Sequence, residues 1–312
     1  MALADEIAQS QGLERAWVRK VIGQSAYLPQ VAKLIAPPPG GQRKNWEAYR
    51  SRFIEPVRVQ AGCRFWQAHD KTLARASQTF GVPPEMVVGI IGVETLYGRH
   101  MGNFKVVDAL ATLSLDFPNS HPRAAERTAY FRGELAQVLA LKKTGINPLD
   151  LRGSYAGAMG MPQFMPTSWA KFAVDFDGDG RIDLFNSTPD VIGSVANYFK
   201  AFNWQSGMPT HYPLNFDTTK LDMGTLMLPD ILPTFSPARM AELGVVLDEA
   251  GQQHPGKLAL IELQNGDQAT SYVAGTDNFY AVTRYNWSSY YAMAVIELGQ
   301  TIKAQVQSGC GA

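Results

Sequence analysis

The sequence predicts a mainly α-helical protein of the α+β class, in which a helical body carries a small β-containing lobe. Along most of the 312-residue chain, apolar residues recur at helical spacing. One stretch, KLALIELQNGDQATSYVAG at 257–275, is typical of two strands joined at Asn265-Gly266. The composition, with 46% apolar and 18% charged residues, is that of a globular chain and not of a disordered one.

The order of these patterns divides the chain into four parts. The breaker cluster PPPGG at 37–41 marks the first boundary, and proline and glycine become frequent after Trp204. We expect an N-terminal helical segment over 1–40, a helical core over 41–205, a small β-containing lobe over 206–276 and a return to the helical body over 277–312. Residues 3–35 predict two short helices around Gly23 and Ser25.

Charge and composition exclude several classes of protein. The 28 acidic and 28 basic residues balance, which argues against a dedicated nucleic-acid binder. No apolar run is long enough to span a membrane. The start, MALADEIAQSQGLERAW, lacks the apolar core of a signal peptide, so the protein is either cytoplasmic or an export signal has been replaced by Met1. Cys63 and Cys310 fit no metal or redox spacing and form one disulfide or none.

The segment from Pro83 to Gly98, PPEMVVGIIGVETLYG, predicts a buried helix that carries one carboxylate. Its two prolines suit the first helical turn, and apolar residues then fall on almost every side. Glu94 lies near the C-terminal end. Burial raises the pKa of a carboxyl group, and a carboxyl that keeps its proton near neutral pH can act as a general acid. The alternative is a structural Glu that reaches solvent or pairs with Arg99.

Two further segments have the character of a ligand-binding surface. SYAGAMGMPQFMPTSWAKFAVDF, from Ser154 to Phe176, has three glycines before Pro162, which indicates a tight turn that either leaves room for a ligand or packs against the buried helix. Tyrosines gather before the last helix, at Tyr285, Tyr290 and Tyr291. They suit sugar rings but are nearly as often core or interface residues.

The sequence DFDGDGRIDLFN resembles the first half of an EF-hand-like calcium loop. Carboxylates at positions 1, 3 and 5 and a glycine at position 6 fit that pattern: Asp175, Asp177, Asp179 and Gly180. The backbone carbonyl of Arg181 would supply position 7. Position 12 is Asn186 instead of Glu, so the closing carboxylate must come from elsewhere, and Asp190 is the nearest candidate. Three carboxylates this close favour a bound cation, and the missing Glu favours a structural role over a sensor.

Six segments occur in an order that is more specific than any one of them: GVPPEMVVGIIGVETLYGRHMG, VVDALATLSLDFP, GSYAGAMGMPQFMPTSW, AVDFDGDGRIDLFN, IGSVANYFKAFNW and NFYAVTRYNWSSYYAMAV. Together they cover roughly 45–204 and 277–300. They resemble the lytic murein transglycosylases of the membrane-bound B type.

This resemblance implies a lysozyme-like helical core with an extra helical lobe and a small β-containing lobe. Residues 41–205 would be the lysozyme-like catalytic core, with the calcium loop at 175–190. The resemblance also implies cleavage of the MurNAc-β-1,4-GlcNAc bond of peptidoglycan without water, in which the muramoyl O6 attacks its own C1 to give a 1,6-anhydromuramoyl product. Glu94 matches the single catalytic acid/base, which would protonate the leaving oxygen and then accept the O6 proton.

Other positions match the family one by one. Ser154 and Gln163 match residues that line the cleft beside the acid. The residues that match glycan contacts are Tyr49, Tyr130, Tyr198, Tyr285, Asn286 and Tyr291. The residues that match calcium ligands are Asp175, Asp177, Asp179, Arg181 and Asp190. Trp287 stands where the family often has a polar residue.

We therefore expect a peptidoglycan lytic transglycosylase in the periplasm, whose export signal or lipid anchor is absent from this chain. Its expected partners are glycan strands, with other cell-wall enzymes as candidates, and it needs no organic cofactor but a structural Ca²⁺. The alternatives are a lysozyme-like muramidase that hydrolyses the same bond, a non-catalytic peptidoglycan-binding protein and a calcium-regulated sensor.

Overall fold

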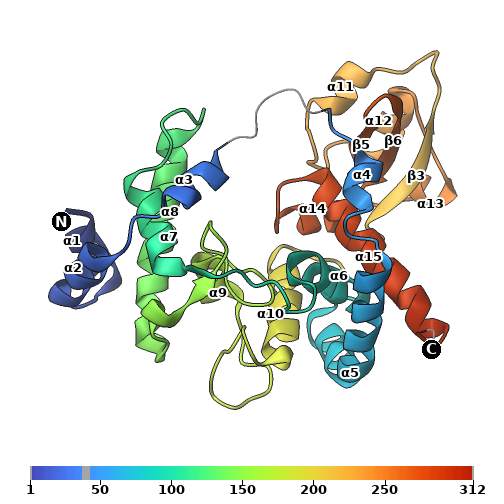
Figure 1. Ribbon diagram of the computed structural model, residues 1–312. Coiled ribbons are helices and arrows are strands. Elements are labelled where there is room, and N and C mark those ends of the chain that lie inside the picture. The colour runs from blue at the N-terminus through green and yellow to red at the C-terminus, as the bar shows by residue number, and fades with distance from the viewer. Residues whose placement is uncertain (1, 37–42, 311–312) are drawn as a thin grey trace. The chain divides into compact units, whose positions relative to one another are not determined.

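The computed structural model describes residues 2–36 and 43–310, which form two compact units (Figure 1). Unit 1 contains the described residues of 1–41 and 97–194, and unit 2 contains those of 42–96 and 195–312. Each unit is therefore built from two stretches that lie far apart in the sequence.

Unit 1 is mainly helical. Its elements are α1 Ala2–Gln11, α2 Arg15–Gln24, α3 Pro29–Ile35, β1 Phe104–Lys105, α7 Val106–Leu115, α8 Ala124–Ala140, the 3-10 turns η1 Leu141–Thr144 and η2 Pro148–Asp150, β2 Arg152–Gly153, α9 Pro166–Phe172 and the start of α10 Thr188–Ala201. The prediction of two helices between residues 3 and 35 was wrong. A third helix arises because Gly12 adopts a φ of 57°, which ends α1.

Packing within unit 1 places the glycine-rich loop. Helix α7 packs on α8, and α8 packs on α9. Strands β1 and β2 pair antiparallel, with Phe104 opposite Gly153. This short pair fixes the point at which the chain enters the loop that begins at Ser154.

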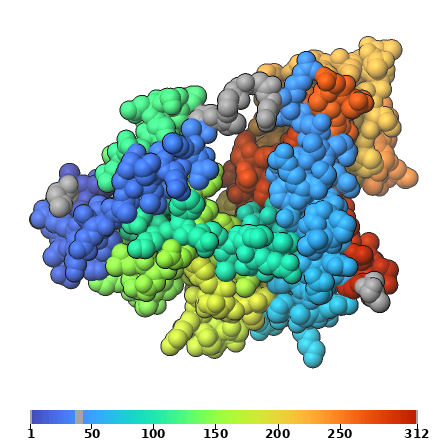
Figure 2. Space-filling model, in the orientation of Figure 1, coloured from blue at the N-terminus to red at the C-terminus, as the bar shows by residue number. Residues whose placement is uncertain are grey.

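Unit 2 contains the buried helix that the sequence predicted. Its helices are α4 Trp46–Arg50, α5 Pro56–Phe80, α6 Pro84–Thr95, the rest of α10, α11 Met223–Met227, α12 Pro237–Glu242, α13 Glu249–Gln252, α14 Asp277–Thr283 and α15 Ser289–Gln307. Figure 2 shows α4 and α5 on the outer surface of unit 2 in this view, whereas α6 is buried from Met86 to Gly92.

Helix α6 packs closely against α15 because both present a glycine at the contact. A Cβ atom on Gly89 would lie 2.4 Å from the carbonyl oxygen of Val295, and one on Gly299 would lie 2.1 Å from that of Glu85. Only glycine permits this backbone approach. The contact holds the end of α6, where Glu94 lies, against the first turns of α15.

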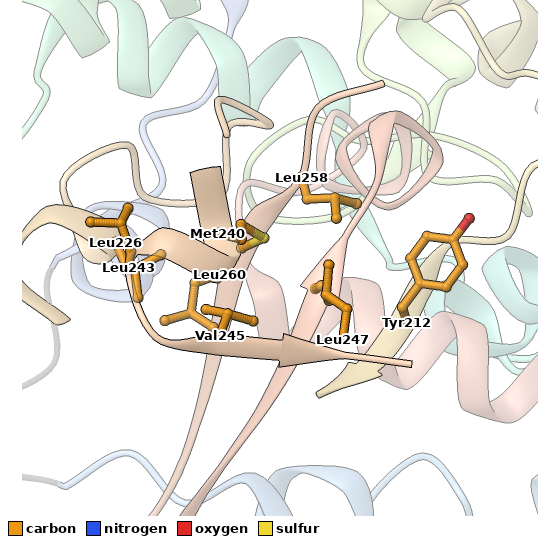
Figure 3. Packing of buried hydrophobic residues seen from close by; sticks show 9 residues of the cluster. Tyr212, Leu226, Met240, Leu243, Val245, Leu247, Leu258 and Leu260 are labelled. Carbon is orange, nitrogen blue, oxygen red and sulfur yellow. The ribbon is translucent and has the colours of Figure 1, made fainter. Parts of the chain in front are cut away.

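A four-stranded antiparallel sheet in the order β4-β3-β6-β5 forms the β-containing part of unit 2. Its strands are β3 His211–Phe216, β4 Val245–Leu247, β5 Ala259–Asn265 and β6 Gln268–Gly275. The predicted hairpin is confirmed as β5–β6, whereas β3 and β4 were not predicted. Figure 3 shows the apolar cluster that covers this sheet, with Leu226 and Met240 from helices packed among strand residues such as Leu247 and Leu260.

A disulfide joins Cys63 on α5 to Cys310, which follows α15, with 5.9 Å between the Cα atoms. The sequence left open whether these cysteines pair. The bond ties the end of the last helix to α5 within unit 2.

Candidate active site and metal loop

Glu94 lies in the last turn of α6, just before Leu96 adopts a left-handed φ of 50° and ends the helix. Its side chain is half-buried. The hydroxyl of Tyr291 on α15 donates a hydrogen bond to Glu94 Oε1 at 2.5 Å. Burial raises the pKa of Glu94 to about 7, against the opposing effect of the Tyr291 hydrogen bond, which favours the ion. A large fraction of this carboxyl therefore holds a proton at neutral pH.

A group of tyrosines surrounds this carboxyl in unit 2. The ring of Tyr285 stacks on that of Tyr291 with 6.4 Å between centroids, and Tyr198 packs on Tyr285 at 4.7 Å. Burial raises the pKa of Tyr285 and of Tyr291 well above the usual value, so both hydroxyls stay protonated. Tyr291 is only 3% exposed, so its hydroxyl serves Glu94, a role that the sequence did not predict.

The remaining predicted residues of unit 2 differ in exposure. Tyr49 is half-buried, and its burial and the negative charge of Glu94 raise its pKa. Asn286 is exposed. Tyr198 is 5% exposed and donates its hydroxyl hydrogen to the backbone oxygen of Arg284 at 2.6 Å. The structure thus gathers Glu94, Tyr49, Tyr198, Tyr285 and Tyr291 in one unit.

Three other predicted residues belong to unit 1. Ser154 is half-buried, and its hydroxyl oxygen accepts hydrogen bonds from the backbone N–H groups of Ala156 and Ala158. Gln163 has a left-handed φ of 52°, and its amide nitrogen donates to the backbone oxygens of Met101 and Gly160. These bonds fix the shape of the glycine-rich loop. Tyr130 is 41% exposed on α8.

Glu134 is a buried carboxylate that the sequence analysis did not single out. It is 1% exposed and accepts hydrogen bonds from the backbone N–H and the hydroxyl of Thr167, in the first turn of α9. Burial raises its pKa. Because it satisfies the N-terminal turn of a helix, we interpret it as a structural residue.

The predicted metal loop brings three carboxylates together. One oxygen from each of Asp175, Asp177 and Asp190 lies within 4.8 Å of the others. Asp190 is 1% exposed, and the backbone N–H groups of Phe176 and Asp183 donate to its two oxygens. Asp190, the residue expected to close the loop, thus lies in the cluster, and burial raises its pKa.

The other two predicted ligands lie outside that cluster. Asp179 is exposed, and one of its oxygens accepts a hydrogen bond from the backbone N–H of Arg181. Arg181 is also exposed. The three clustered side chains offer carboxylate oxygens, which are the kind of donor that calcium binds.

Within residues 2–36 and 43–310, every helix is too short or too polar to cross a lipid bilayer.

Residues 1–300 match the model of the transglycosylase SLT domain. The chain is 40% identical to membrane-bound lytic murein transglycosylase B of Escherichia coli K12, over 97% of this chain and 82% of the relative. Its structure superposes on soluble lytic transglycosylase SltB1 of Pseudomonas aeruginosa with a TM-score of 0.85 and 35% identity, covering 99% of each chain. The structure of E. coli lytic transglycosylase Slt35 in a complex with calcium superposes with a TM-score of 0.84 and 38% sequence identity, covering 98% of this chain and 93% of that one.

These findings confirm both the predicted fold class, with its lysozyme-like helical body, and the predicted family. The chain belongs to the transglycosylase SLT domain family, as a lytic transglycosylase that acts on peptidoglycan.

Proposed function

We propose that Glu94 is the single acid/base of a non-hydrolytic cleavage of the MurNAc-β-1,4-GlcNAc bond. The observation that carries this proposal is a half-buried carboxyl whose pKa is raised to about 7 and which accepts a hydrogen bond from a buried tyrosine. Such a group can both give and take a proton near neutral pH. The family relationship supplies the substrate.

The chemistry needs two proton transfers through the same carboxyl. Glu94 first protonates the bridging oxygen as the bond from C1 of the muramoyl residue to that oxygen breaks. The muramoyl O6 then forms a bond to C1, and the carboxylate accepts the O6 proton. The product is a 1,6-anhydromuramoyl end, no water is consumed, and Glu94 regains its starting state. Glycosidases that add water commonly use two carboxylates, and one suffices here because the nucleophile belongs to the substrate.

Tyr291 is a positioning residue in this scheme. Its hydroxyl holds one oxygen of Glu94 at 2.5 Å, and its own pKa is too high for it to compete for the proton. The ring of Tyr285 stacks on that of Tyr291, and Tyr198 packs on Tyr285 in turn. Ser154, Gln163, Tyr49, Tyr130, Tyr198, Tyr285, Tyr291 and Asn286 stay predicted substrate-binding residues on the basis of the family resemblance.

The experiment that tests this function is digestion of purified peptidoglycan sacculi, with mass spectrometry of the released muropeptides. The wild-type protein should release anhydro products, and the Glu94→Gln variant should retain its fold and release none. Products one water heavier would show a muramidase, and binding without release would show a non-catalytic peptidoglycan-binding protein. Full activity of the Glu94→Gln variant would contradict the assignment of the acid.

Calcium is the ion proposed for the loop, with Asp175, Asp177 and Asp190 as carboxylate ligands. The relative Slt35 was solved in a complex with calcium, and the buried Asp190 supplies the carboxylate that the loop lacks at its twelfth position. The ion would neutralise three close negative charges and tie the loop to the start of α10. Asp179 and the carbonyl of Arg181 stay predicted ligands that would complete the shell.

Two features support action outside the cytoplasm, in the periplasm. The substrate of the family is the cell wall, and the Cys63–Cys310 disulfide is stable in oxidising compartments. Other cell-wall enzymes stay candidate partners.

The four-part division of the chain at 40, 205 and 276 likewise stays a prediction.

A further inference from the structure

Tyr290, in the first turn of α15, contacts two other elements of unit 2. Its ring lies edge-on to the rings of Trp46 and Tyr49, both on α4, with 5.8 Å between centroids in each pair. Its hydroxyl donates a hydrogen bond to the backbone oxygen of Gln264 on β5 at 2.8 Å. The side chain is only 8% exposed. One buried tyrosine therefore joins α4, β5 and α15.

The end of β5 also holds α4. The side-chain oxygen of Asn265 accepts a hydrogen bond from the backbone N–H of Glu47 at 3.2 Å. The backbone N–H of Gly266 donates to the backbone oxygen of Lys44 at 2.9 Å. Asn265 is itself tied to β6, because its side-chain nitrogen donates to the backbone oxygen of Ala269 at 3.0 Å. The start of α4, and with it the rings that pack on the tyrosine, is thus fixed to the β5–β6 hairpin.

Tyr290 and Tyr291 are neighbours on one helix, so their side chains move together. Successive residues of an α-helix point about 100° apart around its axis. Tyr290 contacts α4 and β5, whereas Tyr291 donates its hydroxyl hydrogen to Glu94 on α6. A rotation of the first turn of α15 would therefore displace both hydroxyls at once.

A second side chain of this turn reaches β5 over a longer distance. The hydroxyl of Ser289 donates to the backbone oxygen of Glu262 at 3.4 Å, compared with 2.8 Å for the bond from Tyr290 to Gln264. Hydrogen bonds between oxygen atoms are normally 2.5–3.0 Å long. The tyrosine is therefore the stronger of these two anchors.

We propose that Tyr290 is a positioning residue for the cleavage reaction, which fixes the rotation of the first turn of α15 and so holds the hydroxyl of Tyr291 on Glu94. The inference rests on the proposed function for the reaction itself. The hydroxyl of Tyr290 bonds to β5 and its ring packs on α4, so it acts through Tyr291 and not on the sugar. It also gives the β-containing part of unit 2 a role in catalysis, because β5 supplies the oxygen that anchors the turn.

Tyr290→Phe tests the proposal, because it keeps the ring and removes only the anchoring hydroxyl. Steady-state kinetics on soluble peptidoglycan strands should show kcat reduced about tenfold, since a misplacement of about 1 Å at an active site can cost about 100-fold. KM should change less, because the ring that packs on α4 is retained. The pKa of Glu94, followed by carbon-13 nuclear magnetic resonance, should rise, because a weaker hydrogen bond from Tyr291 stabilises the carboxylate less.

A double variant tests the route of the effect. In the Tyr291→Phe background the hydrogen bond to Glu94 is already absent, so Tyr290→Phe should not raise the pKa of Glu94 further. Such non-additivity is the sign of two residues that act through one contact. Additive shifts in the double variant would show another route to the acid and would contradict the proposal.

The matched control is Tyr212→Phe on β3. Tyr212 is also 8% exposed, and its hydroxyl lies 3.2 Å from Nδ1 of His254, within the β-containing part of unit 2. Loss of this hydroxyl should lower the melting temperature about as much as Tyr290→Phe does. It should leave kcat and the titration of Glu94 as in the wild-type protein.

Two further results would overturn the proposal. A folded Tyr290→Phe protein with the wild-type kcat and the wild-type titration of Glu94 would make the tyrosine a purely structural residue. An equal fall of kcat in Tyr212→Phe would show a general effect of lost stability. Failure of the proposed function would appear differently, as the absence of anhydro products in wild-type digests.

Discussion

The protonation of Glu94 depends on two opposing effects at the scale of single residues. Burial favours the neutral acid, and the hydroxyl of Tyr291 favours the carboxylate. Their balance leaves the pKa at about 7, so the acid form declines as the pH rises through neutrality. The cleavage rate should therefore fall on the alkaline side with an apparent pKa near this value.

Replacement of Tyr291 by Phe tests this balance. Loss of the hydrogen bond removes the contact that stabilises the carboxylate, so the pKa of Glu94 should rise by about one unit, the expected size for a hydrogen bond to a charged group. The alkaline limb of the pH–rate profile should move to higher pH. Tyr272→Phe is the control, since its hydroxyl donates to Glu262 in the β lobe and its loss should leave the profile unchanged. Identical profiles for Tyr291→Phe and the wild-type enzyme would contradict the role of this contact.

At the scale of elements, the contact between α6 and α15 decides where Glu94 lies. The Gly89→Ala variant should lose about 2–3 kcal/mol in the free energy of unfolding, because its Cβ would lie 2.4 Å from a backbone oxygen that cannot move aside alone. Denaturation by urea gives this value. The control is Gly133→Ala on α8, where a Cβ would meet no atom within 4 Å. That variant should be neutral or gain roughly 0.5–1 kcal/mol, and equal losses in both variants would contradict the packing argument.

The metal loop gives a second prediction for an element. Calcium should raise the melting temperature of the wild-type protein, and a chelator should reverse the change. Asp190→Asn should abolish most of this shift, because the buried carboxylate belongs to the cluster. Asp179→Asn should reduce it less, because that side chain is exposed and outside the cluster. An undiminished calcium effect in the Asp190→Asn variant would remove this residue from the ligands.

Elements with strong local signals could be predicted from the sequence, and the others could not. The apolar run from Met86 to Gly92 specifies a buried helix by itself, and Asn265-Gly266 specifies a hairpin. Strands β3 and β4 escaped prediction because β3 contains Pro213 and β4 has only three residues, so neither shows a clear alternation. Gly12 was missed as a helix end because α2 begins only three residues later, at Arg15, so the helical pattern is barely interrupted.

At the scale of the whole molecule, the decisive contacts join residues far apart in the chain. Tyr291 and Glu94 are 197 residues apart, and Tyr198 and Arg284 are 86 apart. Local periodicity carries no information about such pairs. Family resemblance placed Tyr291 among glycan contacts, whereas its burial and its hydrogen bond indicate a positioning role. The closing carboxylate Asp190 could be proposed in advance because it lies near its loop in sequence.

The Cys63–Cys310 disulfide should stabilise the molecule as a whole. It closes a loop with a sequence separation of 247 residues, which restricts the unfolded chain. The double variant Cys63→Ala/Cys310→Ala should lose about 2–4 kcal/mol in the free energy of unfolding. Reduction of the wild-type protein should lower its stability to the same level, and the double variant should not respond to the reductant. A wild-type protein that is indifferent to reduction would contradict this contribution.

The central claim concerns a proton on one carboxyl group, and nuclear magnetic resonance can observe it directly. Titration of protein labelled with carbon-13 at the glutamate side-chain carboxyl, with the Glu94→Gln variant used to assign the signal, gives the pKa of Glu94. We predict a value of about 7. A titration near the ordinary value of 4.5 would leave the group ionised at neutral pH and would contradict its role as the acid.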